Sequence, residues 1–189
     1  MKVSVIESLP GVMRVDLSGV SFGLANTIRR VAMASVGCFA IDKVTFYDNS
    51  SALFDEYLAH RLGLVPITTP KGYDEKDNVV FSIDVEGPAT VYSRDMKSSD
   101  KEVAVANGNI PIIKLAEGQK LRFDGQAVLG KGSKASKFQP GLVTYKSKDA
   151  TNFEFYIESF GQMPANEIMK RALDIITSNL KEIQKEIKK

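Results

Sequence analysis

The chain opens with two short segments, at positions 3–8 and 13–18, in which apolar and polar residues alternate. Alternation with a period of two is typical of β-strands that have one buried face. Residues 9–11 between them include proline and glycine, which favour turns, so we expect a β-hairpin. Apolar residues then recur at helical spacing from Phe22 to Ser35, after Ser21, whose hydroxyl can cap a helix. This pattern predicts a first helix.

The middle of the chain has a different texture. A β-branched and aromatic run at 41–47 predicts a strand, and helical spacing returns over 54–62 before Gly63, which suits a helix end. From 66 to 148, short apolar runs are separated by glycine, proline and charged residues, and no helix fits. In this stretch we expect strands at 79–85, 89–93, 110–115 and 120–129.

The last part of the chain combines one strand with one long amphipathic helix. Residues 151–159 alternate cleanly, and Pro164 suits the beginning of a helix. Along this helix, apolar residues recur every three or four positions among lysines and glutamates, namely Met169, Ala172, Ile176, Leu180, Ile183 and Ile187. An apolar stripe of this kind needs a surface to cover it, either within the chain or on a partner protein.

These elements predict an α+β fold. Strands and a helix come first, a β-rich stretch follows, and a strand and helix come last. We infer a discontinuous α/β domain built from both termini, residues 1–48 and 153–189, with a β-rich domain of residues 49–152 inserted into it.

Composition narrows the possible functions only a little. The 25 lysines and arginines nearly balance the 23 acidic residues, so the net charge attracts nucleic acid weakly. The single cysteine, Cys38, excludes an internal disulfide and a cysteine-clustered metal site, and we expect no cofactor. No run approaches the ~20 apolar residues of a membrane span, and no leader pattern stands at the N-terminus. We therefore expect a cytoplasmic protein.

Three polar residues lie together on the first predicted helix. Asn26 is three and four positions before Arg29 and Arg30, so these side chains can share one face. They can form a solvated face or bind a partner protein, because arginine is suited to protein interfaces. His60 is the only histidine and has no nucleophile near it in sequence, so we expect a structural or interface role rather than catalysis.

A lysine-rich loop suggests two rival functions. Residues 125–131 resemble a phosphate-binding loop, but Gly132 stands where a serine or threonine should bind magnesium. A nucleotide-dependent enzyme would need Lys131 to hold phosphate. The lysines of the loop can otherwise form a solvated surface, dock on an acidic protein, or bind nucleic acid. They are Lys131, Lys134, Lys137, Lys146 and Lys148.

Several ordered motifs resemble the α-like, third-largest subunits of cellular RNA polymerases, and the archaeal D-type form most of all. Residues 22–33 (FGLANTIRRVAM) resemble the helix near the N-terminus of that family, and residues 55–67 (DEYLAHRLGLVPI) resemble its archaeal and eukaryotic branch. Shorter matches follow in the family's order at 87–93, 127–132 and 138–140, and residues 155–161 lead into the last helix.

The chain also departs from these relatives. It lacks the cysteine-rich insertion that many have near 145–152 and the zinc-binding loop that some have near 71–78. With one cysteine it cannot hold an iron–sulfur cluster through four thiolates. In addition, residues 135–138 (ASKF) stand where relatives tend to have a histidine and a tryptophan. The resemblance is thus to a form without the iron–sulfur domain.

The resemblance implies an architectural role in transcription. The terminal domain would pair with an L-like subunit as a heterodimer, and the pair would be the platform on which the large catalytic subunits assemble. Further contacts would go to the second-largest subunit and to a small N-like subunit, with no chemistry in this chain and no expected contact with DNA. The implied partner-contacting residues are Asn26, Ile28, Arg29, Arg30, Arg61, Leu64, Pro66, Lys131, Gln139, Met169, Ala172, Ile176, Leu180 and Ile183.

Overall fold

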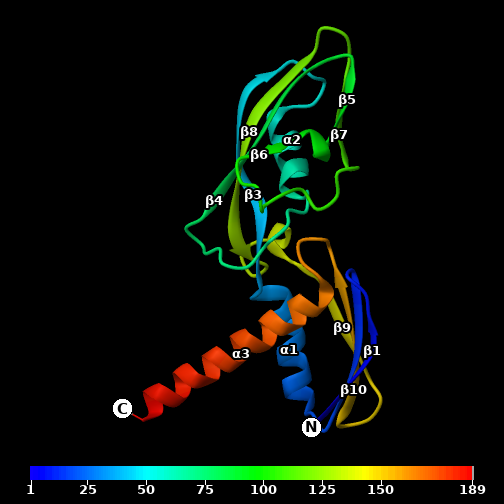
Figure 1. The fold of residues 1–189 in the computed structure, drawn as a ribbon, viewed down its shortest axis with the longest axis vertical. Coiled ribbons are helices and arrows are strands. Elements are labelled where there is room, and N and C mark those ends of the chain that lie inside the picture. The colour runs from blue at the N-terminus through cyan, green and yellow to red at the C-terminus, as the bar shows by residue number, and fades with distance from the viewer. Residues whose placement is uncertain (189) are drawn as a thin grey trace. The chain divides into compact units, whose positions relative to one another are not determined.

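The computed structural model describes residues 1–188 (Figure 1). The chain forms two compact units. The terminal unit consists of Met1–Gly37 and the chain from Lys131 onward, and the inserted unit consists of Cys38–Gly130. Helices and sheets occur in both units, so the predicted α+β class is confirmed.

A four-stranded antiparallel sheet forms the base of the terminal unit. Its strands are β1 (Lys2–Ser8), β2 (Val12–Ser18), β9 (Gly141–Ser147) and β10 (Asn152–Ser159), and their order is β1-β2-β10-β9. The ends of the sequence therefore meet in the middle of this sheet, where β2 pairs with β10. The hairpin of β1 and β2 was predicted from the alternation, and β9 was not.

Two helices, α1 (Phe22–Ala34) and α3 (Ala165–Ile187), pack on the sheet and on each other. The Ser21 hydroxyl accepts a hydrogen bond from the Leu24 N–H at 3.3 Å, so the predicted cap begins α1. The core between the helices and the sheet is made of apolar side chains from all three parts: Ala25, Ile28 and Ala32, then Phe153, Phe155 and Ile157, then Ile168, Met169 and Ala172.

The inserted unit is built around a second sheet. Its strands are β3 (Gly37–Asn49), β8 (Lys120–Lys131), β4 (Asn78–Glu86) and β6 (Lys97–Ser98), in the order β3-β8-β4-β6. Beside it, β5 (Ala89–Tyr92) and β7 (Pro111–Leu115) form a two-stranded ribbon. Helix α2 (Asp55–Gly63) places Leu58 and Leu62 in the same core as Phe39, Phe81 and Phe123.

The units divide at different residues from those expected from the sequence. The divisions lie after Gly37 and after Gly130, whereas we expected them after residues 48 and 152. The reason is strand pairing, because β3 lies beside β8 in the inserted sheet and β9 pairs with β10 in the terminal sheet. The stretch expected to contain no helix has two single 3₁₀ turns, Ser93–Asp95 and Ser136–Phe138.

Candidate partner interfaces

The apolar stripe of α3 divides into a buried half and an exposed half. Met169 and Ala172 are 6% and 0% exposed, within the core of the terminal unit. Ile176 is half-buried, and Leu180 and Ile183 are 61% and 56% exposed. The stripe ends at Ile187, which is 79% exposed. The structure therefore presents the second half of the stripe to solvent and closes the first half inside the unit.

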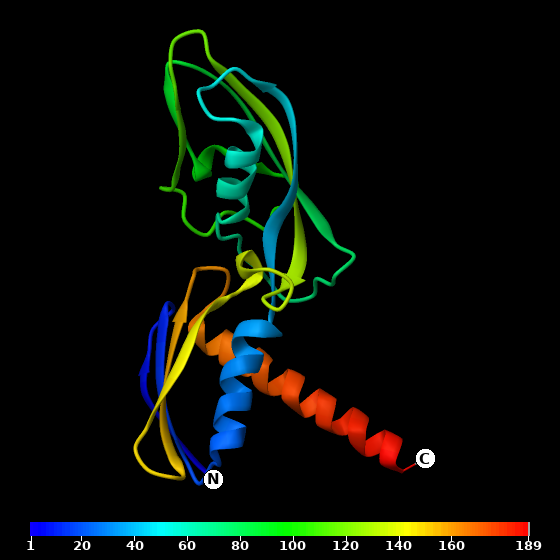
Figure 2. The same ribbon diagram turned by 180° about the vertical axis from the view of Figure 1, so that it is seen from behind.

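The exposed half of α3 extends beyond the rest of the terminal unit. Figures 1 and 2 show, from opposite sides, that the helix leaves α1 and the sheet and continues without a neighbouring element in that unit. Every described residue from Thr177 onward is exposed. Burying a large apolar side chain stabilises a protein by roughly 1.5–3 kcal/mol, so a surface that covered this half of the helix would gain stability.

Helix α1 presents its polar residues in two different ways. The Arg29 guanidinium donates hydrogen bonds from Nε and Nη2 to Oδ1 of Asn26, at 3.2 and 3.0 Å, so this pair is held together as the spacing predicted. The side chain of Arg30 is exposed and forms no hydrogen bond or ion pair with any residue between 1 and 188. Ile28 is only 3% exposed and belongs to the core. Arg30 is therefore the predicted α1 residue most available to a partner.

The predicted contacts near α2 belong to the inserted unit. Arg61 donates from Nη2 to the Pro111 carbonyl at 2.7 Å, which fixes its guanidinium beside β7. Leu64 directly follows α2 and is 56% exposed. Pro66 is half-buried, and its carbonyl accepts a hydrogen bond from the Ala106 N–H at 2.9 Å. These residues offer one fixed cation and one exposed apolar side chain.

The segment that resembled a phosphate-binding loop is a strand. Residues 125–131 lie within β8, where Gly125 is opposite Phe81 of β4 in the antiparallel ladder. A phosphate cradle needs a loop with free N–H groups and a helix that begins directly after it. Here the next helical segment along the chain is the single turn Ser136–Phe138. The geometry therefore gives Lys131 no phosphate site.

The lysine-rich loop after β8 packs against its own unit. The Ser133 N–H donates to the Ala34 carbonyl at 3.0 Å, and Lys134 and Lys137 place their ammonium groups 5.5 and 5.3 Å from the ring centre of buried Phe138. Gln139 donates from Nε2 to the Gly141 carbonyl at 3.0 Å. This loop is a fixed part of the fold rather than a free basic arm.

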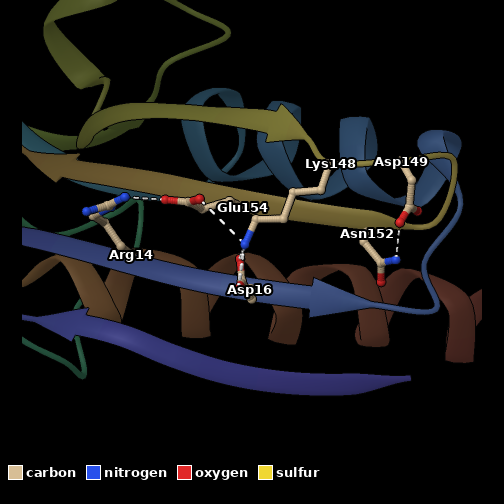
Figure 3. Close-up of polar contacts among 6 residues, drawn as sticks. All are labelled: Arg14, Asp16, Lys148, Asp149, Asn152 and Glu154. Atoms are coloured by element: carbon tan, nitrogen blue, oxygen red, sulfur yellow. Dashed lines mark hydrogen bonds and ion pairs between the residues drawn. The ribbon is translucent and has the colours of Figure 1, made fainter.

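An ion-pair network covers the outer face of the terminal sheet (Figure 3). Glu154 lies between two cations, accepting a hydrogen bond from Arg14 and approaching the Lys148 Nζ at 3.6 Å. Lys148 also contacts Asp16 at 2.7 Å. The hydrogen bond from Arg14 lowers the pKa of Glu154, and the hydrogen bond to Asp16 raises the pKa of Lys148. Lys148 thus stays charged, and its ammonium is paired with the carboxylates of Asp16 and Glu154.

A groove of ≈ 880 Å³ on the inserted unit is lined by both charged and apolar residues. One of its carboxylates, Asp124, accepts hydrogen bonds from Tyr47 at 2.9 Å and Ser82 at 2.6 Å. The bond from Ser82, and then that from Tyr47, lower the pKa of Asp124. A carboxylate with a lowered pKa is a weak base at neutral pH. Asp124 is therefore held in the groove as a hydrogen-bonded carboxylate.

Metal-binding clusters and membrane spans are both absent from the described part of the chain. Residues 1–188 contain no group of three or more His, Cys, Asp and Glu side chains arranged to hold a metal ion. Over the same residues, no helix is both long and apolar enough to cross a lipid bilayer.

Sequence reasoning missed one exposed surface on the inserted unit. Phe54 is 74% exposed and Tyr57 is 50% exposed, on the same side of the chain as Arg61 of α2. Phe54, Tyr57 and Arg61 recur at spacings of three and four residues, which indicates a second side of the helix. The apolar pair Leu58 and Leu62 follows the same kind of spacing, so the sequence alone did not show which side is exposed.

Comparison with known proteins identifies relatives of the chain. Residues 41–144 match the family described as RNA polymerase Rpb3/RpoA insert domain. The chain is 45% identical over 152 residues to the DNA-directed RNA polymerase subunit Rpo3 of Methanocaldococcus jannaschii, covering 80% of this chain and 78% of that protein. It is 32% identical over 228 residues to Rpo3 of Halobacterium salinarum, covering 92% of each.

The relatives differ in length from this chain. Rpo3 of Thermococcus kodakarensis is 44% identical over 168 residues, covering 82% of this chain and 65% of that protein. The chain spans 59% of the Pyrococcus furiosus relative, to which it is 46% identical. It therefore matches only about two thirds, or less, of these longer relatives.

Proposed function

We propose, since the chain belongs to the Rpb3/RpoA family of RNA polymerase subunits, that it is a non-catalytic assembly subunit of a DNA-dependent RNA polymerase. In this role it forms a heterodimer with a smaller L-like subunit. The pair is the platform on which the large catalytic subunits assemble. The chain acts in the cytoplasm and contributes no chemistry of its own.

The exposed half of the α3 stripe is the observation that carries this proposal. Leu180 and Ile183 continue the spacing of residues that are buried in the first half, but the described part of the terminal unit leaves them mostly exposed, and Ile176 is half-buried. Helix-on-helix packing is the usual way to bury such a stripe in a permanent complex. An L-like subunit with a matching helix would cover it.

Three of the predicted contact residues lie in the core next to this interface and not on its surface. Ile28, Met169 and Ala172 are buried where α1 and α3 pack together, so they fix the direction in which α3 leaves the unit. Their contribution to pairing is to position the exposed half. In the proposal, direct contact with the L-like subunit begins near Ile176.

The remaining predicted contacts go to other subunits. Arg30, with the Asn26–Arg29 pair beside it, offers a guanidinium to an acidic or carbonyl group of the second-largest subunit. Leu64 and Arg61 offer an apolar side chain and a fixed cation to the same subunit. The inserted unit also contacts a small N-like subunit. Pro66, Lys131 and Gln139 complete the proposed contact residues.

Tagged purification from the native cell tests the proposal. A tagged full chain purified at high salt should bring with it one small α-like protein and two very large subunits. The Leu180→Lys variant should lose the small protein, whereas Ser178→Lys, which adds the same charge to the same half of α3 away from the stripe, should retain it. Recovery of the chain alone, or with metabolic enzymes, would contradict the proposed function.

A further inference from the structure

Strand β4 is longer than the strand that covers its outer edge. It pairs with β8 from Asn78 to Glu86, whereas β6 pairs with it only at Phe81 and Ser82. Residues 83–86 therefore have β8 on one side and none of the described strands on the other. We call residues 83–86 the open edge of β4.

Main-chain groups at the open edge point away from β8. Val80 shows the direction, because its N–H donates to the Ser99 hydroxyl at 3.0 Å and its carbonyl accepts the Ser99 N–H at 2.8 Å, on the β6 side. These groups alternate in direction along a strand, so those of Asp84 point to the same side as those of Val80. An N–H and a carbonyl that point outward from a sheet edge can pair with the main chain of another extended segment.

The groove of ≈ 880 Å³ on the inserted unit includes the open edge in its lining. Ile83, Asp84 and Val85 line it from β4, and Ala89 and Thr90 line it from β5. Pockets that hold ligands have volumes of roughly 300–1,000 Å³. We call it the β4 groove. It provides the space that an extended segment needs to lie against the open edge.

The carboxylates of the β4 groove already have partners within the chain. Asp124 accepts the two hydrogen bonds described above. Asp95 accepts one from the Tyr92 N–H at 2.7 Å, and Asp84 lies 3.8 Å from the Arg122 guanidinium. These groups therefore have less need of a cation from a partner.

The cations of the β4 groove have hydrogen-bond donors to spare. The Lys97 ammonium, at the start of β6, forms no hydrogen bond or ion pair with any residue between 1 and 188. Arg94 lies over the Tyr92 ring at 4.4 Å and donates from Nη1 to Asn109 at 2.9 Å. Its other guanidinium N–H groups have no acceptor among the same residues. The groove is therefore suited to a segment that carries carboxylates.

Two other occupants fit the β4 groove less well. A nucleic acid has no peptide main chain to pair with the open edge, and Asp84 and Asp95 would repel its phosphates. In a twofold antiparallel pairing of two open edges, Asp84 would lie close to Asp84 of the second copy, and like charges on opposed strands are destabilising. An extended acidic protein segment avoids both conflicts.

We infer that the β4 groove binds an extended acidic segment of a further protein partner, which adds a strand to the open edge and places carboxylates at Lys97 and Arg94. This inference goes beyond the proposed assembly function. None of the residues that line the groove is among the contacts proposed above for the polymerase subunits.

Selection from a library of random peptides displayed on phage tests the inference. The target is the tagged full chain, purified from the native cell with the proteins that accompany it. Selected peptides are synthesised with a fluorescent label, and their affinity is measured by fluorescence anisotropy. We expect them to combine β-branched residues, which favour strands, with aspartate and glutamate.

A charge reversal in the groove tests the acidic character of the segment. Lys97→Glu should weaken binding of the selected peptides by about fivefold, because it replaces an attraction with a repulsion. Lys101→Glu is the matched control, at an exposed position of the same unit outside the groove, and should stay within about twofold of the wild type. Both lysines are exposed, so neither substitution disturbs the core.

Methylation of the peptide main chain tests the added strand. Two series of peptides carry N-methyl groups on every second amide, in opposite phase. The series whose methyl groups face β4 should bind at least about tenfold more weakly, since it loses its hydrogen bonds to the open edge. The series with the opposite phase should stay within about threefold of the unmethylated peptide.

Four results would overturn the inference. The first is a selection that yields no peptide above background, or only basic peptides. The second is equal binding to Lys97→Glu and the wild type, or equal effects of the two methylated series. A labelled single-stranded oligonucleotide that binds the wild type but not Lys97→Glu would identify nucleic acid as the occupant. Self-association of the wild type that Lys97→Glu abolishes would identify a second copy.

Discussion

The two halves of α3 have the same apolar spacing and opposite surroundings. In the first half, Ile168, Met169 and Ala172 are buried in the terminal unit. In the second half, Leu180 and Ile183 are mostly exposed, although they continue the same stripe. The comparison teaches that periodicity identifies the apolar side of a helix but not the surface that covers it. One half stabilises the chain, and the other is available for association.

The largest expected effect comes from a substitution in the buried half of α3. Ile168→Ala removes a side chain that is 0% exposed, so it should lower the free energy of unfolding of the chain by about 2–5 kcal/mol through lost burial and a residual cavity. Urea denaturation followed by circular dichroism measures this change. A loss below about 1 kcal/mol would mean that the first half of α3 is not packed as described.

The exposed half should respond in the opposite way. Ile183→Ala should leave the free energy of unfolding of the chain alone within about 0.5 kcal/mol of the wild type, because the side chain is 56% exposed. The same variant should weaken binding to the L-like subunit by about 1–2 kcal/mol. Titration calorimetry with that subunit measures the second effect. A chain that is destabilised by Ile183→Ala without losing affinity would reverse the comparison.

Helix α1 packs against α3, so a substitution that destabilises α1 should also destabilise the buried half of α3. Ser21→Ala removes the hydroxyl that accepts the Leu24 N–H, so the chain should lose about 1 kcal/mol of stability. Thr27→Ala is the control, since its hydroxyl donates to the Gly23 carbonyl within the same exposed part of the helix without capping it. Thermal unfolding of the two variants separates the effects, and equal shifts would show that the cap has no special role.

The smallest expected effect lies on the outer, polar face of the terminal sheet. Hydrogen bonding from Arg14 lowers the pKa of Glu154 in the folded chain. A lowered pKa stabilises the fold above the pKa that the carboxyl has when unfolded, and this contribution is lost as the pH falls through the folded pKa. Glu154→Gln should therefore be less stable than the wild type at neutral pH, and the difference should shrink in acid.

A control variant makes this pH test specific. Asp174→Asn removes one exposed carboxylate on α3, outside the network drawn in Figure 3. The two variants are compared by urea denaturation at several pH values. A gap between Glu154→Gln and the wild type that stays constant from neutral to acid pH would contradict a role for the ionised carboxylate.

Local patterns predicted most of the elements because their causes are local. The capping Ser21, the alternation in β2 and β10, and the stripe of α3 depend on neighbours along the chain, and the structure contains each of them. Strand β9 was missed because the lysines around it suggested a loop. The run of β-branched and aromatic residues at Val143, Thr144 and Tyr145 could have revealed it.

The candidate interfaces were less predictable, because exposure is a property of the whole fold. Nothing within the stripe distinguishes Ala172, which is fully buried, from Leu180, which is 61% exposed. The pairing of Asn26 with Arg29 followed from spacing, whereas the exposure of Arg30 required the structure. The pocket that residues of α2 and β7 line together also required the structure, since β7 is distant from α2 in the sequence.

Hydrogen–deuterium exchange along α3 tests most directly whether its second half is a docking surface. It is measured for the chain alone and for the chain bound to the L-like subunit. We expect slow exchange near residues 168–172 in both samples, and exchange near residues 176–187 that is fast in the free chain and slow in the complex. Exchange in the second half of α3 that is the same with and without the L-like subunit would contradict the proposed pairing.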